Sequence, residues 1–481
     1  MSESVKKNYL YNILYEILVL IIPLITAPYL SRILGSERIG EYTFSYSIVS
    51  YFILFGRLGI VNHGCREIAK ITSKIERSRF FLSLITIQFA SFLLVLLGYC
   101  VYLFLEVEIE QRLLTTILTI QIIAAAIDVN WFFWGRENFK LTVTRNILVK
   151  LINTLCIFIF IKTKDDLCAY AFILALFQFL GQIVIWYPLK NEIVFTPISW
   201  KDILYHLRPV CVLFIPTIAV SLYKLMDKIM LGALAGKTEL SYYEYGSLFV
   251  GIPLSLITSL GVVMLPRISS FAEKGLHSSN KIYLKYSMLF VIALSFSMSA
   301  GISAIAPTLI PWYLGKDFVS CVPVLIGLSS TLVFLSWANV VRTQYLIPYR
   351  HDKEFIISLF CGAAINLILN WFLIPKYQSM GAVVGTVAAE FFVCFLQTFF
   401  SKDFLEVKVY FRYVGYFLLN AIAIFVTVRL VSHNSFLPIF SLILQISTGI
   451  IVTALFCFIF LKYYFKVGMH DIIQFATHIK L

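Results

Sequence analysis

Charged residues are scarce in this sequence. Only 14% of its 481 residues are Asp, Glu, Lys or Arg, while 60% are hydrophobic and 16% are aromatic. An ordinary soluble domain carries roughly 25% charged residues. A soluble protein of this length needs polar side chains to cover its surface, whereas a protein dissolved in lipid keeps apolar faces everywhere except at its two ends. The shortage of charge therefore excludes a soluble globular fold and places the chain in a membrane.

Motifs of catalysis and metal binding are also missing. The nine cysteines form no CxxC pair and show no Cys/His ligand spacing. The sequence contains neither the Gly-rich phosphate loop of nucleotide hydrolases nor the motifs of zinc proteases and serine hydrolases. We therefore expect no metal, no cofactor, no catalytic residue and no direct use of ATP.

The positive charge is spread rather than clustered. The net charge is +13, but the basic residues are dispersed among short loops, and nucleic-acid binding requires clusters on a water-exposed face. No nucleic-acid partner is therefore expected. Basic residues are frequent in alternate loops, such as 66–79 and 267–285, and loops of this kind face the cytoplasm. We expect a multi-pass protein with both termini cytoplasmic and with its first helix retained.

Long apolar runs fill most of the chain. About fourteen are long enough to cross roughly 30 Å of hydrocarbon at 1.5 Å per residue. They span residues 10–34, 39–62, 80–105, 113–134, 141–161, 167–189, 210–234, 240–265, 283–310, 319–347, 355–374, 381–400, 409–431 and 437–461. The predicted fold class is an all-α polytopic membrane protein. We expect an N-terminal lobe of six helices (1–190), a cytoplasmic linker (191–207), a C-terminal lobe of six helices (208–402), and a final helix pair with a cytoplasmic tail (403–481).

The two predicted lobes resemble each other in sequence. Ser31-Arg32-Ile33-Leu34-Gly35 at the end of the first run recurs as Asp227-Lys228-Ile229-Met230-Leu231-Gly232 at the end of the seventh. Leu58-Gly59-Ile60-Val61 recurs as Leu260-Gly261-Val262-Val263, and Ile152-Asn153 recurs as Ile365-Asn366. Because each predicted lobe has an even number of helices, both lobes start on the same side of the membrane and have the same orientation. Such parallel repeats are typical of transporters with a substrate path between lobes.

Charged side chains inside the apolar runs are the best indicators of function. A charge in hydrocarbon costs a few kcal/mol on insertion scales, so it persists where a cavity or a partner exists. The bases at membrane depth are Arg57, Arg145, Lys150, Lys224, Lys228 and Arg342, and the acids are Glu16, Asp128, Asp227 and Glu390. We interpret the bases as a cationic path for an anionic substrate, and the acids as candidates for proton coupling because burial favours their neutral form.

Less specific roles remain open for the same residues. Lys224, Asp227 and Lys228 share one helical face, so Asp227 could simply neutralise the two lysines. Arg145 and Arg342 could reach the inner interface with their long side chains. Each acid could hydrogen-bond a neighbouring helix or pair with a base.

Several motifs carry a resemblance to a known family. In the first lobe they are Pro28-Tyr29-Leu30-Ser31-Arg32-Ile33-Leu34-Gly35, Gly40-Glu41-Tyr42, Gly59 and Arg66-Glu67-Ile68-Ala69. In the second they are Asn366-Leu367-Ile368-Leu369-Asn370-Trp371-Phe372-Leu373-Ile374-Pro375-Lys376-Tyr377, Gly381-Ala382 and Glu390. With these motifs the chain resembles the bacterial polysaccharide transporters, which flip O-antigen and capsule repeat units. Their superfamily includes multidrug antiporters and the peptidoglycan-precursor flippase.

The resemblance implies a function and a set of residues. It implies two lobes that open alternately to each side of the bacterial inner membrane, and a cationic cavity that receives a polyprenyl-pyrophosphate-linked oligosaccharide. A proton gradient or the membrane potential would drive transport. By position, Arg32, Arg57, Lys224 and Lys228 resemble the family's cavity cations. Membrane lipids, a polysaccharide polymerase and a chain-length regulator are the further partners implied. Alternatives are a proton- or sodium-coupled multidrug antiporter, which needs an acidic cavity, and an oligosaccharide polymerase, which needs sizeable external loops.

Overall fold

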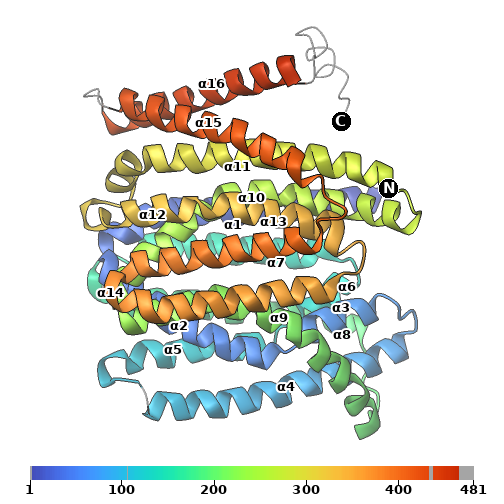
Figure 1. Cartoon of the computed structure of the whole chain (residues 1–481). Helices are drawn as coiled ribbons and strands as arrows, with labels where there is room; N and C mark the ends of the chain where they lie inside the picture. The colour runs from blue at the N-terminus through green and yellow to red at the C-terminus, as the bar shows by residue number, and fades with distance from the viewer. Residues whose placement is uncertain (1–2, 106, 433–436, 465–481) are drawn as a thin grey trace. The chain divides into compact units, whose positions relative to one another are not determined.

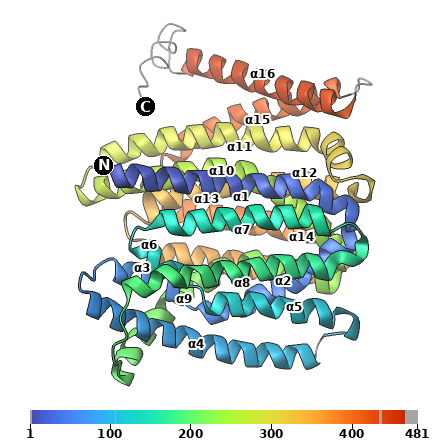
Figure 2. The same ribbon diagram turned by 180° about the vertical axis from the view of Figure 1, so that it is seen from behind.

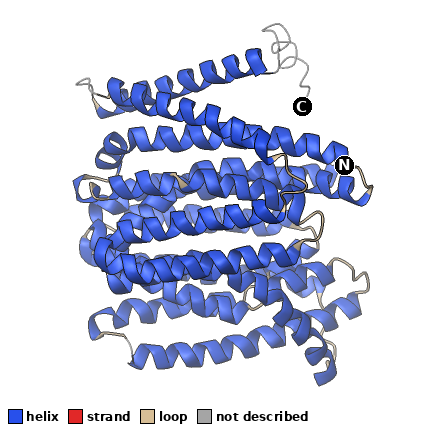
Figure 3. Ribbon diagram, in the orientation of Figure 1, coloured by secondary structure: helices blue, strands red, loops and turns tan. Residues whose placement is uncertain are grey.

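Helices make up the regular structure of the described chain. The computed structural model describes the backbone of residues 3–105, 107–432 and 437–464, and the same side chains except 3–17, 110, 216, 219–220, 222–224 and 464. Within these residues all regular structure is helical, and short loops join successive helices (Figures 1 and 3). The predicted all-α fold class is thereby confirmed.

The chain divides into two compact units, Met1–Ser241 and Tyr242–Leu481. The first contains α1 (Glu3–Ile33), α2 (Gly35–Arg57), α3 (Ile60–Ile68), α4 (Lys74–Leu105), α5 (Ile109–Ala126), α6 (Asn130–Gly135), α7 (Phe139–Phe160), η1 (Lys164–Asp166), α8 (Leu167–Glu192) and α9 (Trp200–Leu234). The second contains most of α10 (Lys237–Glu273), then α11 (His277–Tyr313), η2 (Lys316–Phe318), α12 (Cys321–Ser329), α13 (Thr331–Val341), η3 (Arg342–Leu346), α14 (Asp352–Phe400), α15 (Val407–Val431) and α16 (Pro438–Tyr464).

The unit boundary falls inside α10, one helix later than the predicted lobe boundary. The helix responsible is α9, which packs against α2, α3 and α4 of the first unit. Part of this contact comes from Gly59, which lies so close to the backbone of Val210 and Leu213 that a Cβ at this position would overlap both. The division into lobes at 190 and 208 stays a prediction.

Helices long and apolar enough to span a membrane account for most of the predicted apolar runs. Among the described residues, ten helices are long and apolar enough to cross a membrane, or up to eleven if the bent pair α2 and α3 is one span. Two predicted runs, 355–374 and 381–400, lie in the single long helix α14, which is interrupted at Gln378 by a positive φ of 54°. The first and seventh runs lie in α1 and α9, outside that set.

Each unit buries part of every span and leaves the rest apolar and exposed. On α4, Phe81, Phe92 and Tyr99 are buried, whereas Leu94 and Phe104 are largely exposed. An exposed apolar stripe of this length is unfavourable in water but matches hydrocarbon. In the first unit α7 lies between α1 and α8, as Figure 2 shows. In the second, α15 packs against both α11 and α16 (Figure 1).

Small residues bring the short helices α3 and α6 into close contact. A Cβ on Gly64 would overlap the Trp131 ring, and one on Gly135 would overlap Ile68 and the backbone of Cys65. Helices in membranes associate largely through such close packing, because lipid is as apolar as the helix surfaces. This contact positions the broken span formed by α5 and α6, which carries the polar residues described below.

The α3–α6 contact predicts a cost for one added methyl group. Gly135→Ala should destabilise the purified protein by about 1–3 kcal/mol, as overpacking does elsewhere, and lower its thermal unfolding temperature in detergent. The matched control is Gly98→Ala in α4, where the nearest atom to a Cβ, on Phe52, is 3.8 Å away. That change should be neutral or stabilise the helix by about 0.5–1 kcal/mol. Equal stability of the two variants would contradict the close contact.

Candidate functional site

The first unit contains a polar cavity of about 620 Å³. This volume lies within the range of about 300–1,000 Å³ typical of small-molecule sites. Its polar and aromatic lining comes from α2, α5, α6, α7, α8 and the α5–α6 connection: Tyr42, Tyr46, Arg57, Gln121, Asp128, Asn130, Trp134, Phe139, Thr142, Asn146, Lys150, Asn153, Gln178 and Gln182. The lining is unusual for a membrane-embedded unit, because most of these side chains donate or accept hydrogen bonds.

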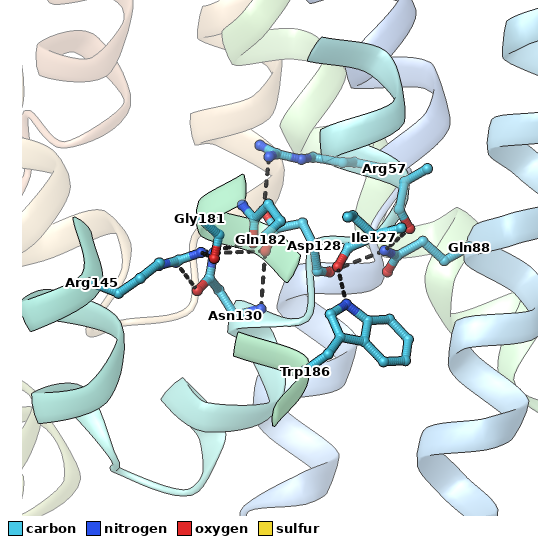
Figure 4. Close-up of polar contacts among 10 residues, drawn as sticks. Arg57, Gln88, Ile127, Asp128, Asn130, Arg145, Gly181, Gln182 and Trp186 are labelled. Atoms are coloured by element: carbon cyan, nitrogen blue, oxygen red, sulfur yellow. Dashed lines mark hydrogen bonds and ion pairs between the residues drawn. The ribbon is translucent and has the colours of Figure 1, made fainter. Parts of the chain in front are cut away.

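The fourth predicted span is broken where it meets the cavity. Helix α5 ends at Ala126 and α6 begins at Asn130, so the regular series of α-helical hydrogen bonds is interrupted between them. The Gln88 side chain donates to the carbonyls of Ala126 (2.7 Å) and Asp128 (3.0 Å), and the Trp186 indole donates to that of Ile127 (2.9 Å), as Figure 4 shows. A break at membrane depth is tolerated only with such partners. Gln88 and Trp186 therefore hold the break that presents Asp128 to the cavity.

A second break lies opposite, between α2 and α3. The two helices are bent by 43°, and Leu58 at the junction has a φ of 47°, which is unusual for a leucine. The carbonyl of Gly56 accepts a hydrogen bond of 2.6 Å from the Ser91 hydroxyl. Arg57 is the last residue of α2. Its side chain thus extends from a helix end into the cavity.

An ion pair joins the two breaks. The Nη2 atom of Arg57 lies 2.9 Å from Oδ2 of Asp128, with the two side chains 40% and 15% exposed. The other carboxylate oxygen of Asp128 accepts hydrogen bonds from the backbone N–H of Asn130 (3.0 Å) and from its side chain (2.7 Å). Among the described residues, the donors to this carboxylate all belong to one of the two breaks (Figure 4).

A buried arginine extends this network behind the cavity wall. Arg145 donates to Oδ1 of Asn130 (2.6 Å), to Oε1 of Gln182 (2.9 Å) and to the carbonyl of Gly181 (2.9 Å). It is buried and its guanidinium group bonds these polar groups of α6 and α8 (Figure 4). The network holds two guanidinium groups and one carboxylate, and it is therefore cationic.

Lys150 adds a further positive charge to the cavity. It lies on α7 one turn after Asn146 and one turn before Asn153, and all three line the cavity. In the described part of the chain its ammonium group has no carboxylate within ion-pair distance. Since Asp128 is already paired with Arg57, the Lys150 charge is available to a ligand. Of the predicted site residues, the structure brings together Arg57, Asp128 and Lys150 in the lining of this cavity.

Three further predicted residues of the first unit whose side chains the structure describes lie outside this lining. Arg32 is exposed at the end of α1 and donates to the carbonyl of Pro28 (3.0 Å). Asp227 is buried on α9 and interacts electrostatically with Tyr51 of α2. Lys228 is partly buried beside it. The side chains of Glu16 and Lys224 lie outside the described residues.

Two predicted residues belong to the second unit. Arg342 begins the π-helical turn η3, and its guanidinium group lies 5.8 Å from the Phe355 ring centre. Glu390 is buried on α14 and interacts electrostatically with Arg342. The predicted cation and the predicted acid of this unit are therefore neighbours.

The predicted site omitted the uncharged polar residues. Gln121, Asn146, Gln178 and Gln182 line the cavity. The available signal was their spacing, since Asn146, Lys150 and Asn153 repeat at helical intervals on α7, and Gln178 and Gln182 do so on α8. A polar face on an otherwise apolar span marks a surface turned away from lipid.

The sequence of this chain matches a protein family and is similar to proteins of other organisms. The sequence model of the family described as polysaccharide biosynthesis protein matches residues 5–272. The putative O-antigen transporter of Escherichia coli (strain K12) is 24% identical over 404 residues, which cover 83% of this chain and 97% of that protein. The putative O-antigen transporter of Shigella dysenteriae is 24% identical over 388 residues, which cover 80% of this chain and 97% of that protein.

Solved structures share the fold. The lipid II flippase MurJ, in an inward closed conformation, aligns with a TM-score of 0.76 and 16% identity over 95% of this chain and 98% of that chain. An inward-facing multidrug resistance MATE family transporter aligns with a TM-score of 0.63 and 14% identity over 81% of this chain and 94% of that chain. Because the family's sequence model matches more than half of the chain, this multi-pass membrane protein belongs to the polysaccharide biosynthesis protein family.

Proposed function

We propose that this protein moves polyprenyl-pyrophosphate-linked oligosaccharides from the cytoplasmic to the outer leaflet of the bacterial inner membrane by alternating access. The polar cavity of the first unit carries this proposal, because Lys150, which has no acidic partner among the described residues, lies there beside a cationic network within membrane-spanning helices. The putative O-antigen transporters, which align over most of their length, support the same function.

The cavity addresses the main physical obstacle to such transport. A pyrophosphate with attached sugars loses its water in hydrocarbon, and each unpaired polar group then costs several kcal/mol. Amide, hydroxyl and cationic side chains in the cavity replace that water. The anionic headgroup moves outward with the membrane potential, which is worth about 2.3 kcal/mol per charge per 100 mV.

The two alternative functions fit the cavity less well. A multidrug antiporter for cationic drugs needs an acidic side chain whose charge no base neutralises. Asp128 of the cavity lining is instead paired with Arg57. A polymerase needs an external domain or long loops, and the described residues between helices form short connections. We therefore favour a transporter without enzymatic activity. A polymerase and a chain-length regulator would receive its product, and both termini would be cytoplasmic.

The Arg57–Asp128 pair bears on how transport is driven. Protonation of Asp128 would release Arg57 for an anionic headgroup, so proton binding and headgroup binding favour each other. A proton antiporter needs the opposite relation, in which proton binding expels the substrate. We therefore assign the driving force to the membrane potential rather than to proton exchange at Asp128. Glu16, Asp227 and Glu390 stay as predicted candidates for coupling.

Deleting the gene should cause a lipid-linked oligosaccharide to accumulate in the inner leaflet. The same lipid, extracted from those cells and incorporated with purified protein into vesicles, should be flipped, and faster when an imposed potassium diffusion potential makes the donor side negative. Vesicles without protein are the control. Protein that is folded but does not flip the lipid would contradict the proposed function.

Replacing Asp128 should strengthen anion binding. Asp128→Asn imitates the protonated acid, so it should bind sugar-free undecaprenyl pyrophosphate in nanodiscs about tenfold more tightly, which corresponds to one charge-assisted hydrogen bond. Asp165→Asn, at an exposed position in η1, is the matched control and should leave the affinity unchanged. Weaker binding by stably folded Asp128→Asn would show that the carboxylate itself serves the substrate.

A further inference from the structure

The cavity is richer in amides than an anion requires. Six carboxamide side chains line it: Gln121, Asn130, Asn146, Asn153, Gln178 and Gln182. Each carboxamide offers both a donor and an acceptor. A pyrophosphate only accepts hydrogen bonds, and arginine, lysine and backbone N–H groups match it best. Carboxamide oxygens that no donor of the protein reaches therefore suggest a ligand that also donates, as a polyol does.

Four of these carboxamides have no partner within the protein. In the described part of the chain, no hydrogen bond is formed by the side chains of Gln121, Asn146, Asn153 and Gln178. The Oδ1 atom of Asn153 is fully buried as well. A buried acceptor without a partner costs about 1–3 kcal/mol. Asn130 and Gln182 differ, because they bond Arg145 and so shape the wall.

Aromatic rings form another part of the wall. Tyr42 and Tyr46 stand one turn apart on α2 with their rings parallel, at 7° and a centre distance of 5.7 Å. Tyr42 is fixed by an edge contact with Tyr170 at 4.9 Å, whereas Tyr46 is 39% exposed. The faces of aromatic rings are electron-rich, so they attract the weakly positive C–H face of a sugar ring.

We propose that this cavity is a glycan subsite, in which the unpartnered amides and the Tyr42–Tyr46 pair bind the sugar rings of the headgroup. The proposal rests on the proposed function and assigns the sugar part of the substrate to this cavity. Lys150, between Asn146 and Asn153 on α7, meets the negative group of the same headgroup. That group is either the linking pyrophosphate or an acidic sugar.

The test compares two probes for binding to the protein in nanodiscs. One is the lipid-linked oligosaccharide extracted from gene-deleted cells, and the other is sugar-free undecaprenyl pyrophosphate. Asn146→Leu and Asn153→Leu should each weaken binding of the first probe about three- to tenfold, as expected for one hydrogen bond, and leave the second within twofold. Asn153→Leu removes an unpaired buried acceptor, so its thermal stability should be equal to or above that of the wild type.

Matched variants separate sugar binding from folding. Thr154→Val lies beside Asn153, but its hydroxyl bonds its own helix at the carbonyl of Lys150 (2.8 Å), so both affinities should stay unchanged. Tyr46→Phe should retain binding of the oligosaccharide probe, and Tyr46→Leu should weaken it severalfold. Lys150→Gln should weaken binding of both probes if its partner is the pyrophosphate, and of the oligosaccharide alone if its partner is an acidic sugar.

Two results would overturn the subsite. One is unchanged oligosaccharide affinity in Asn146→Leu, Asn153→Leu, Tyr46→Leu and Lys150→Gln, and the other is an equal loss for both probes in the two asparagine variants. In either case, wild-type protein that still flips the extracted lipid leaves the proposed function intact. Wild-type protein that neither binds nor flips the lipid would remove both proposals.

Discussion

The cavity of the first unit depends on one ion pair between two interrupted helices. In hydrocarbon, a broken helix exposes carbonyl groups that only the protein can satisfy, and a charge needs a partner or a wet cavity. Here both requirements are met at one place. Gln88 and Trp186 bond the carbonyls of the α5–α6 break, Ser91 bonds the end of α2, and Arg57 with Asp128 ties the two ends together (2.9 Å).

The same arrangement explains how a mostly apolar protein keeps a cationic interior. Asp128 neutralises one guanidinium group and, through Asn130, orients a second one on Arg145. Lys150 lies beside them, and no acid in the described part of the chain pairs with it. A cluster of three bases without an acid would repel itself. One shared acid therefore stabilises the site and still leaves net positive charge for a headgroup.

Sequence predicted the fold well because each span is a local signal. Length and apolarity fix a transmembrane helix almost independently of its neighbours, and even the interruption of α14 at Gln378 appeared as two separate runs. The site was predicted in part. Charges at membrane depth are conspicuous, so Arg57, Asp128 and Lys150 stood out. Neutral amides such as Gln121 and Asn146 cost less free energy in hydrocarbon than a charge does, so they stand out less in the sequence. Only the packing of the helices shows that they line one cavity.

The central claim is that Arg57 and Asp128 act as one unit that holds both breaks. A double-mutant cycle of Arg57→Leu and Asp128→Leu, followed by the free energy of unfolding in mixed detergent micelles, tests it most directly. Each single variant leaves a charge without its partner, so the double variant should be more stable than the sum of the single effects predicts. We expect a coupling energy of about 1–2 kcal/mol, within the range found for contacting residues. Additive effects of the two substitutions would contradict it.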